Sequence, residues 1–258
     1  MKETAMNYSK LLQGILDIAE EMLVAGAEVS RVEDSVERMC EAYGCDRVNA
    51  FVITSNIQVT MEDPEGEIIT QIRRVVRNDV NFDRLDYLND LSRYICANLP
   101  SVEQLRNKFD EVMARKQQPL VVNLLSGMAI GGSFAIFFGG NIQDGVAAAI
   151  CGFVTVLMNY EIAKLGQNPL ANIFVVSFAA GILSVLTVYL GIGIHTDKIM
   201  IGVIMLLIPG IAMTNGVRDM LTGDIATGML RVANAILLAI AIACGFALSI
   251  FVTGGGLI

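Results

Sequence analysis

The chain has 258 residues, of which 54% are hydrophobic and only 17% are charged, and its mean hydropathy is +0.58. This composition excludes an intrinsically disordered protein and is unusual for a soluble one. The net charge of −8, without a basic cluster, argues against nucleic acid as a partner, because contact with phosphates needs a surface rich in Lys and Arg.

The charges are concentrated in the first half of the chain. Residues 1–118 contain 21 of the 26 acidic and 14 of the 18 Lys and Arg residues, whereas residues 119–258 contain five acidic and four basic ones. A domain of 140 residues with so few charges would expose an apolar surface in water. We therefore predict a mainly α-helical membrane protein, with a cytoplasmic α+β domain at 1–118 and a transmembrane domain at 119–258.

The soluble half begins with two predicted helices. Apolar residues at helical spacing over residues 11–23 indicate the first, and Gly26 suits the position just after its end. Ser30 and Glu33 have the spacing of a capping box, which predicts the start of a second helix that ends at Gly44.

Three strands and two further helices are predicted next. Residues 47–54, 57–61 and 67–75 are rich in β-branched side chains, with a turn at residues 63–66, and leucines over 85–95 mark a helix. Another capping box at Ser101 opens the last helix of this half. For the charged residues Glu28, Arg31, Glu33 and Asp34, two interpretations stay open: a solvated helix face, or a contact with the membrane domain or a ligand.

Five apolar segments predict five transmembrane helices. The first is about 28 Å long as a helix, close to the roughly 30 Å of a hydrocarbon core. Gly127 and Gly131 in it, and Ala241 and Gly245 in the last, predict close helix packing. The five segments are residues 120–138, 145–160, 170–194, 199–214 and 232–252.

The distribution of Lys and Arg predicts the orientation of these helices. Five crossings place Arg115, Lys116, Lys164, Arg218 and Arg231 on one side of the membrane and only Lys198 on the other. Because the more basic side is cytoplasmic, the N-terminus is expected in the cytoplasm and the C-terminus outside.

Polar residues gather around the inner end of the fourth segment. Pro209 and Gly210 predict a broken helix, and broken helices offer free backbone groups to charged solutes in transporters. Arg218 suits a carboxylate, and Asp219 suits an ammonium group or a coupling proton. The candidate substrate-binding residues are Thr214, Asn215, Arg218, Asp219, Pro209 and Gly210, and the candidates for ion coupling are Asp219, Glu161 and Asp224.

Structural alternatives remain for these residues. Asp224 suits the N-cap of the fifth helix, and Arg218 and Asp219 suit a cytoplasmic loop pair.

His195 is the sole histidine and the five cysteines have no metal-ligand spacing, so we expect no metal, cofactor or disulfide. Paired intramembrane carboxylates, a Ser–His pair and an HExxH motif are missing from the sequence, which argues against an enzyme. A membrane-anchored sensor or scaffold with a ligand-binding soluble domain is the alternative function.

Three segments give the chain a resemblance to a known family. They are residues 26–34 (GAEVSRVED), 85–93 (LDYLNDLSR) and 209–224, which contains PG followed by TNGVRDMLTGD. With these segments the sequence resembles the large subunit of split threonine/serine exporters, a bacterial family that includes two-component succinate exporters. The resemblance implies export of small polar metabolites across the cytoplasmic membrane, driven by an ion gradient. It also implies a partner: a small hydrophobic membrane subunit that supplies the second half of the transporter. Whether the substrate is an amino acid or a dicarboxylate stays open.

Overall fold

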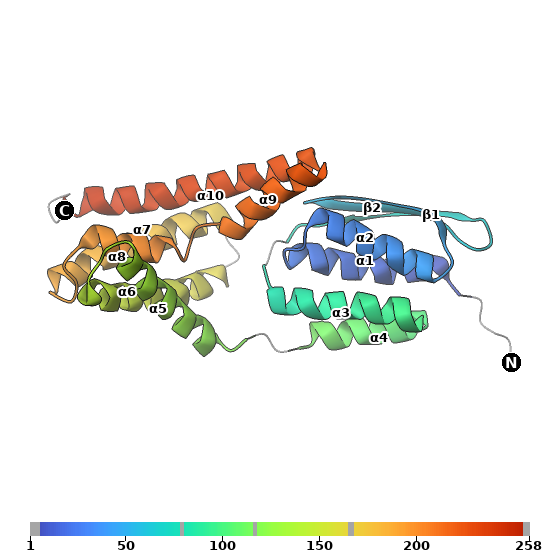
Figure 1. Cartoon of the computed structure of the whole chain (residues 1–258), viewed down its shortest axis with the longest axis horizontal. Helices are drawn as coiled ribbons and strands as arrows, with labels where there is room; N and C mark the ends of the chain where they lie inside the picture. The colour runs from blue at the N-terminus through green and yellow to red at the C-terminus, as the bar shows by residue number, and fades with distance from the viewer. Residues whose placement is uncertain (1–5, 78–79, 116–117, 165–167, 255–258) are drawn as a thin grey trace. The chain divides into compact units, whose positions relative to one another are not determined.

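The computed structural model describes residues 6–77, 80–115, 118–164 and 168–254 (Figure 1). The backbone forms two compact units, which are described separately. The first comprises residues 1–117 together with 212–232, and the second comprises residues 118–211 together with 233–258.

Two helices joined by a short turn open the first unit. Helix α1 (Tyr8–Val24) starts at the N-cap Asn7, whose side chain accepts a hydrogen bond from the amide of Lys10. It ends in a turn in which Gly26 has a φ of +99°, as expected for a glycine just after a helix.

Helix α2 (Val29–Ala42) has Glu28 as its N-cap residue. The prediction of a capping box at Ser30 is therefore wrong. The carboxylate of Glu33 does not reach back to the helix start. It accepts a hydrogen bond of 2.8 Å from the amide of Val52, on a strand distant in the sequence. Gly44 follows the end of α2 with a φ of +80°, and Asp34 and Arg38, four positions apart on α2, form an ion pair at 2.8 Å.

The three predicted strands form one antiparallel sheet of order β1-β2-β3. They are β1 (Asp46–Ile53), β2 (Asn56–Glu62) and β3 (Ile68–Arg74). The carboxylate of Asp63 accepts hydrogen bonds from the amides of Glu65 and Glu67, which closes the turn between β2 and β3. Alternation of side chains along β2 turns Ile57, Val59 and Met61 into the core.

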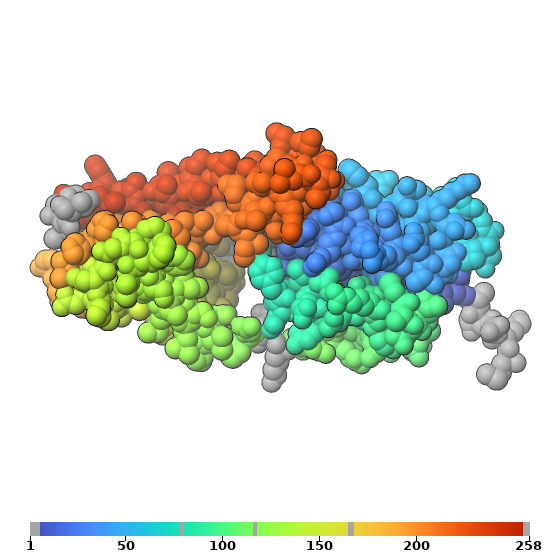
Figure 2. Space-filling view, in the orientation of Figure 1, coloured from blue at the N-terminus to red at the C-terminus, as the bar shows by residue number. Residues whose placement is uncertain are grey.

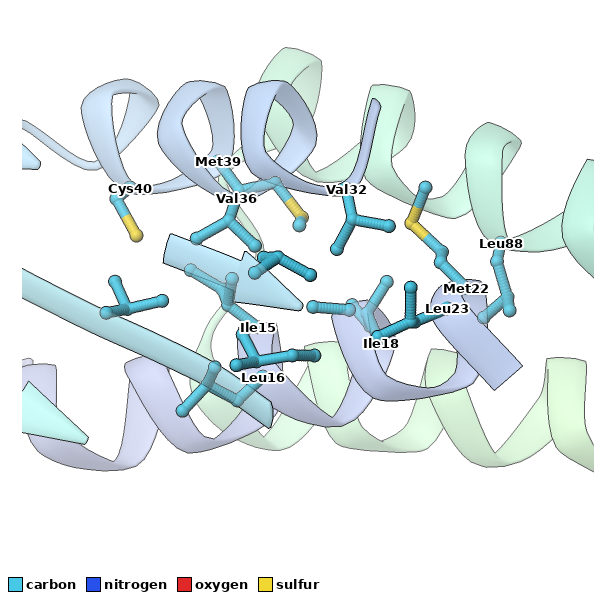
Figure 3. Close-up of a cluster of buried hydrophobic side chains, with 14 of the residues drawn as sticks. Ile15, Leu16, Ile18, Met22, Leu23, Val32, Val36, Met39, Cys40 and Leu88 are labelled. Atoms are coloured by element: carbon cyan, nitrogen blue, oxygen red, sulfur yellow. The ribbon is translucent and has the colours of Figure 1, made fainter. Parts of the chain in front are cut away.

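Two more helices complete the N-terminal part of this unit, α3 (Phe82–Asn98) and α4 (Val102–Met113). Both hydrogen bonds of the predicted capping box between Ser101 and Gln104 are present. Helices α1 and α2 pack against the sheet, and α3 and α4 pack against these helices. Figure 3 shows the resulting core, in which side chains such as Ile18 and Met22 of α1 face Val32 of α2. On the face seen in Figure 2, α2, α3 and α4 lie side by side.

Among the described residues of the second unit, four helices are long and apolar enough to cross a membrane. They are α5 (Leu120–Phe137), α6 (Ile142–Ala163), α7 (Pro169–Tyr189) and α10 (Ile225–Val252), the last of which begins in the first unit. Most of the α5 surface is uncovered in the chain itself, since only 17% of its most apolar window is buried. An apolar surface of this kind suits lipid or another membrane protein.

The predicted count of five transmembrane helices is not confirmed. The segment expected at 199–214 is divided into α8 (Thr196–Ile204) and the start of α9 (Gly210–Thr222). Pro209 has no amide hydrogen to continue the helical ladder, and the five residues 205–209 separate the two helices. The last helix is also longer than expected, because it begins at Ile225 instead of residue 232.

Glycines allow helices of the second unit to approach closely. A Cβ on Gly152 of α6 would lie 2.4 Å from the carbonyl oxygen of Gly127 of α5. A Cβ on Gly202 of α8 would lie 2.4 Å from the carbonyl oxygen of Gly131. The small residues of the predicted GxxxG pair therefore sit at backbone-to-backbone contacts.

A buried carboxylate joins the start of α6 to the loop before α8. Asp144 is fully buried, and its Oδ1 accepts hydrogen bonds from the amides of Ile194 (2.7 Å) and His195 (2.8 Å). Its Oδ2 lies 2.8 Å from Nδ1 of His195. The sole histidine thus belongs to a structural network at this end of the unit.

Candidate functional site

The polar segment predicted to handle solutes forms α9 and the turn into α10. Within the first unit, α9 lies against the turn between α1 and α2 (Figures 1 and 2). This turn contains two carbonyl groups that accept side-chain donors. Asn215 Nδ2 donates to the carbonyl oxygen of Gly26 at 3.3 Å, and Arg231 Nη2 donates to that of Ala27 at 2.8 Å.

Arg218 makes the third contact of this site. Its guanidinium donates to the carboxylate of Glu28, the residue that precedes the first turn of α2. The Arg218 side chain remains 61% exposed, whereas that of Glu28 is 27% exposed. The candidate carboxylate-binding group is therefore paired with a carboxylate of the chain itself and still open to solvent.

Asp219 is the most deeply buried group of the site, with an exposed fraction of 1%. One carboxylate oxygen lies 3.3 Å from Nη1 of Arg231, whose side chain is 12% exposed. Neither oxygen has a well-oriented hydrogen bond within the described part of the chain. Burial raises the pKa of Asp219, and the charge of Arg231 and the amide of Val29 partly oppose this shift.

Two glycines hold α9 against the beginning of α10. A Cβ on Gly228 would lie 2.5 Å from the carbonyl oxygen of Gly216, so the two backbones touch at this point. Gly223 makes the turn with a φ of +109°. Asp224 directly precedes α10, and its carbonyl accepts the amide of Gly228, which places it at the N-cap position that the sequence allowed.

The sequence-predicted residues fall into two groups. Thr214, Asn215, Arg218, Asp219 and Asp224 belong to the first unit, whereas Pro209, Gly210 and Glu161 belong to the second. Glu161 is exposed near the end of α6 and forms an ion pair of 2.8 Å with Lys164.

Arg231 was not predicted from the sequence as a residue of this site. Arg231 entered only the prediction of helix orientation, although a lone arginine near the start of an apolar helix indicates a specific partner. The partners are Asp219 and the carbonyl of Ala27. Glu28 was one of four charged residues with two open interpretations, and it contacts Arg218 within the first unit. Among the described residues, no group of three His, Cys, Asp or Glu side chains is placed to hold a metal ion.

A comparison with protein families identifies the chain. The family model described as "Putative threonine/serine exporter" matches residues 13–253. The chain belongs to this family. The match includes both units and every residue of the α9 site, so the resemblance carried by residues 26–34, 85–93 and 209–224 is confirmed. As a family member with several apolar helices, the chain is a multi-pass membrane protein.

Relatives of this exporter family fall into two lengths. The chain is 25% identical over 234 residues to the "Probable succinate transporter subunit YjjP" of Escherichia coli (strain K12), which covers 90% of this chain and 91% of that protein. It is 26% identical over 248 residues to the "Threonine/serine exporter" of Corynebacterium glutamicum, covering 90% of this chain but 49% of that protein. A "Probable threonine/serine exporter" of Mycobacterium tuberculosis is 26% identical, with 95% and 46% covered. The chain thus spans about half of these longer exporters. No solved structure matches it.

Proposed function

We propose that the chain is the large subunit of a secondary transporter that exports small, carboxylate-bearing polar metabolites across the bacterial cytoplasmic membrane, coupled to an ion gradient. Membership of the exporter family supports export, and the relatives' printed names include threonine/serine and succinate transport. The arrangement of Arg218 in the α9 site is the single observation that carries the assignment of the binding residue.

Arg218 is proposed to bind the carboxylate of the substrate. In the structure this guanidinium is occupied by Glu28, an internal carboxylate of the same chemistry. A substrate carboxylate would replace Glu28, and the exposed part of the guanidinium offers it access. Asn215 and Thr214 on α9, and backbone groups freed at Pro209 and Gly210, would contact the polar remainder of the substrate.

Asp219 is the leading candidate for ion coupling. It is buried, and its pKa is raised, which makes proton uptake easier than at an exposed aspartate. Asp224 and Glu161 are the other candidates.

A small hydrophobic membrane subunit is the proposed partner. The Escherichia coli relative is named as a subunit, and the longer exporters contain about as much chain again beyond the matched half. The uncovered apolar surface of α5 fits a membrane protein as well as lipid.

Chain connectivity supports five crossings, with α8, residues 205–209 and the start of α9 making the fourth as a broken helix. Helices α5, α6 and α7 cross three times from the cytoplasmic unit and end outside. Asn215 and Arg231 contact that same unit, so the chain must return to its side before α10 begins. The N-terminus would then be cytoplasmic and the C-terminus outside, in agreement with the basic residues Lys164, Arg218 and Arg231. Lys116, which also entered the orientation argument, lies outside the described residues.

Transport by reconstituted vesicles tests the proposal. The chain and a co-expressed small hydrophobic subunit are placed in vesicles that are loaded with serine, threonine or succinate, and efflux is followed under an imposed proton gradient. We expect efflux that requires both chains. Arg218→Ala should abolish it while the protein still inserts in the membrane, and Arg74→Ala, an exposed arginine of β3, should leave it unchanged. Binding of a ligand without any efflux would favour a membrane-anchored sensor instead.

A further inference from the structure

A polar groove lies between α2 and α3 in the first unit, and none of its lining residues belongs to α9. Its volume is about 470 Å³, which falls in the range of small-molecule sites. The groove brings together two of the sequence segments singled out above, 26–34 and 85–93, and the second of these plays no part in the α9 site. The lining residues that matter here are Arg31, Asp34, Arg38, Asn89, Ser92 and Arg93.

Positive charge dominates this lining. Three guanidinium groups line the groove, from Arg31, Arg38 and Arg93, against the single carboxylate of Asp34. Asp34 pairs with Arg38 at 2.8 Å, and Asp90, outside the lining, lies 3.4 Å from Arg93. Both pairs are largely exposed and hence weak. Arg31 forms no ion pair with any residue that the structure describes.

This concentration of arginines stands out in its surroundings. Residues 1–118 carry a net charge of −7, so a groove with three guanidiniums and one carboxylate opposes the charge of its own domain. Clefts lined by one sign of charge concentrate ligands of the opposite sign.

Neutral groups complete the groove without adding negative charge. Cys96 lies in it, and burial raises the pKa of this thiol although the charge of Arg38 opposes the shift, so the thiol is protonated at neutral pH. The side chains of Asn89 and Ser92 donate to carbonyl groups of α3, which fixes their positions along one wall.

We propose that the α2–α3 groove binds a small organic or inorganic dianion, a dicarboxylate or a phosphate, through the guanidiniums of Arg31 and Arg93. Arginine presents several donors in a planar fork that matches both carboxylate and phosphate oxygens. A dianion can engage the guanidiniums of Arg31 and Arg93 together, whereas a monoanion such as acetate offers a single carboxylate group. This site does not include Arg218, and the proposal does not depend on the proposed transport function.

Calorimetric titration of the full chain in detergent micelles tests the site. The probes are succinate and inorganic phosphate as dianions and acetate as a monoanion. Arg31→Gln and Arg93→Gln should each weaken dianion binding at least tenfold. The matched control is Arg74→Gln, which removes an exposed arginine outside the groove and should leave binding unchanged. Melting curves of all variants verify that they are folded.

The same titration in the Arg218→Gln protein separates the two proposed sites. Dianion binding that persists in Arg218→Gln and is lost in Arg31→Gln supports the groove, and the preference between succinate and phosphate identifies the source of the dianion. The proposal is overturned if the wild-type chain binds neither dianion, if acetate binds as tightly as they do, or if the groove variants bind normally. Binding that is lost only in Arg218→Gln would reject the groove while supporting the transport site.

Discussion

Glu28 and Arg218 form the ion pair that a carboxylate-bearing substrate would break by binding to Arg218. The two side chains come from opposite ends of the sequence, and each is only partly buried. An ion pair of this exposure contributes about 0–1 kcal/mol, which is small enough for a substrate to replace it. Glu28 would therefore act as an internal competitor for the guanidinium.

Glu28→Gln should increase the apparent affinity of the transporter for its substrate. Removing the competing carboxylate leaves Arg218 available, and the KM for efflux should fall by about two- to fivefold, the equivalent of up to about 1 kcal/mol. Glu41→Gln, an exposed carboxylate at the far end of α2, is the matched control. An unchanged KM in Glu28→Gln would show that Glu28 and the substrate do not share this group.

Glu33 gives the first unit a predictable dependence on pH. Burial raises the pKa of its carboxyl group from 4.5, and the hydrogen bond from the Val52 amide opposes this only in part. For an acid with a raised pKa, the favourable contribution to folding is present below its unfolded pKa and is lost as the pH rises through the folded one.

Glu33→Gln should remove the loss of folding stability that ionisation of Glu33 causes as the pH rises. Glutamine stays neutral and keeps an oxygen that can accept from Val52, so the melting temperature of the variant should gain on that of the wild type as the pH increases from about 4.5 to 7. Thermal melts of both proteins at several pH values measure the difference. Glu65→Gln, in the exposed turn between β2 and β3, controls for the loss of one negative charge. A constant difference across the range would contradict the role given to burial.

At the level of elements, close glycine contacts determine how α5 and α6 pack. A methyl group on Gly152 would lie 2.4 Å from the carbonyl oxygen of Gly127, well inside van der Waals contact, so one of the two backbones must shift.

Gly152→Ala should therefore destabilise the second unit, by about 1–3 kcal/mol as in other overpacked sites. The measurement is the melting temperature in detergent, together with the fraction of monodisperse protein. Gly210→Ala is the control, because a Cβ at that position meets open space. Equal melting temperatures for the two variants would mean that α5 and α6 do not approach so closely.

For the whole molecule, the number of crossings decides on which side the chain ends. In the described part of the chain, four continuous helices are long and apolar enough to span, and four crossings would return the C-terminus to the side of the N-terminus. Five crossings, with α8 and the start of α9 as a broken fourth helix, would place it opposite.

A single cysteine introduced as Thr253→Cys in a cysteine-free background should be labelled in intact cells by a membrane-impermeant thiol reagent. Glu65→Cys in the first unit should be protected until the cells are opened. Labelling of both positions only after lysis would contradict five crossings and reduce α8 and α9 to a re-entrant segment.

Local patterns predicted most elements of the N-terminal half. The apolar spacing of α1, the positive-φ glycines Gly26 and Gly44, and the capping box at Ser101 depend on neighbours within a few residues, so they can be read from sequence. The capping box predicted at Ser30 is absent because α2 already begins at Val29, and the Glu33 carboxylate instead accepts a hydrogen bond from Val52 of β1.

By itself, the amino-acid sequence determined that this protein has a charged half and an apolar half, since partition between water and lipid depends on composition summed along the chain. The sequence also determined the family to which the chain belongs. Tertiary structure alone decided that Arg218 meets Glu28, that Arg231 joins Asp219, and that α2 and α3 form an arginine-lined groove. These contacts join residues as far apart as 190 positions. Their energies depend on distance and burial in three dimensions, which no local pattern encodes.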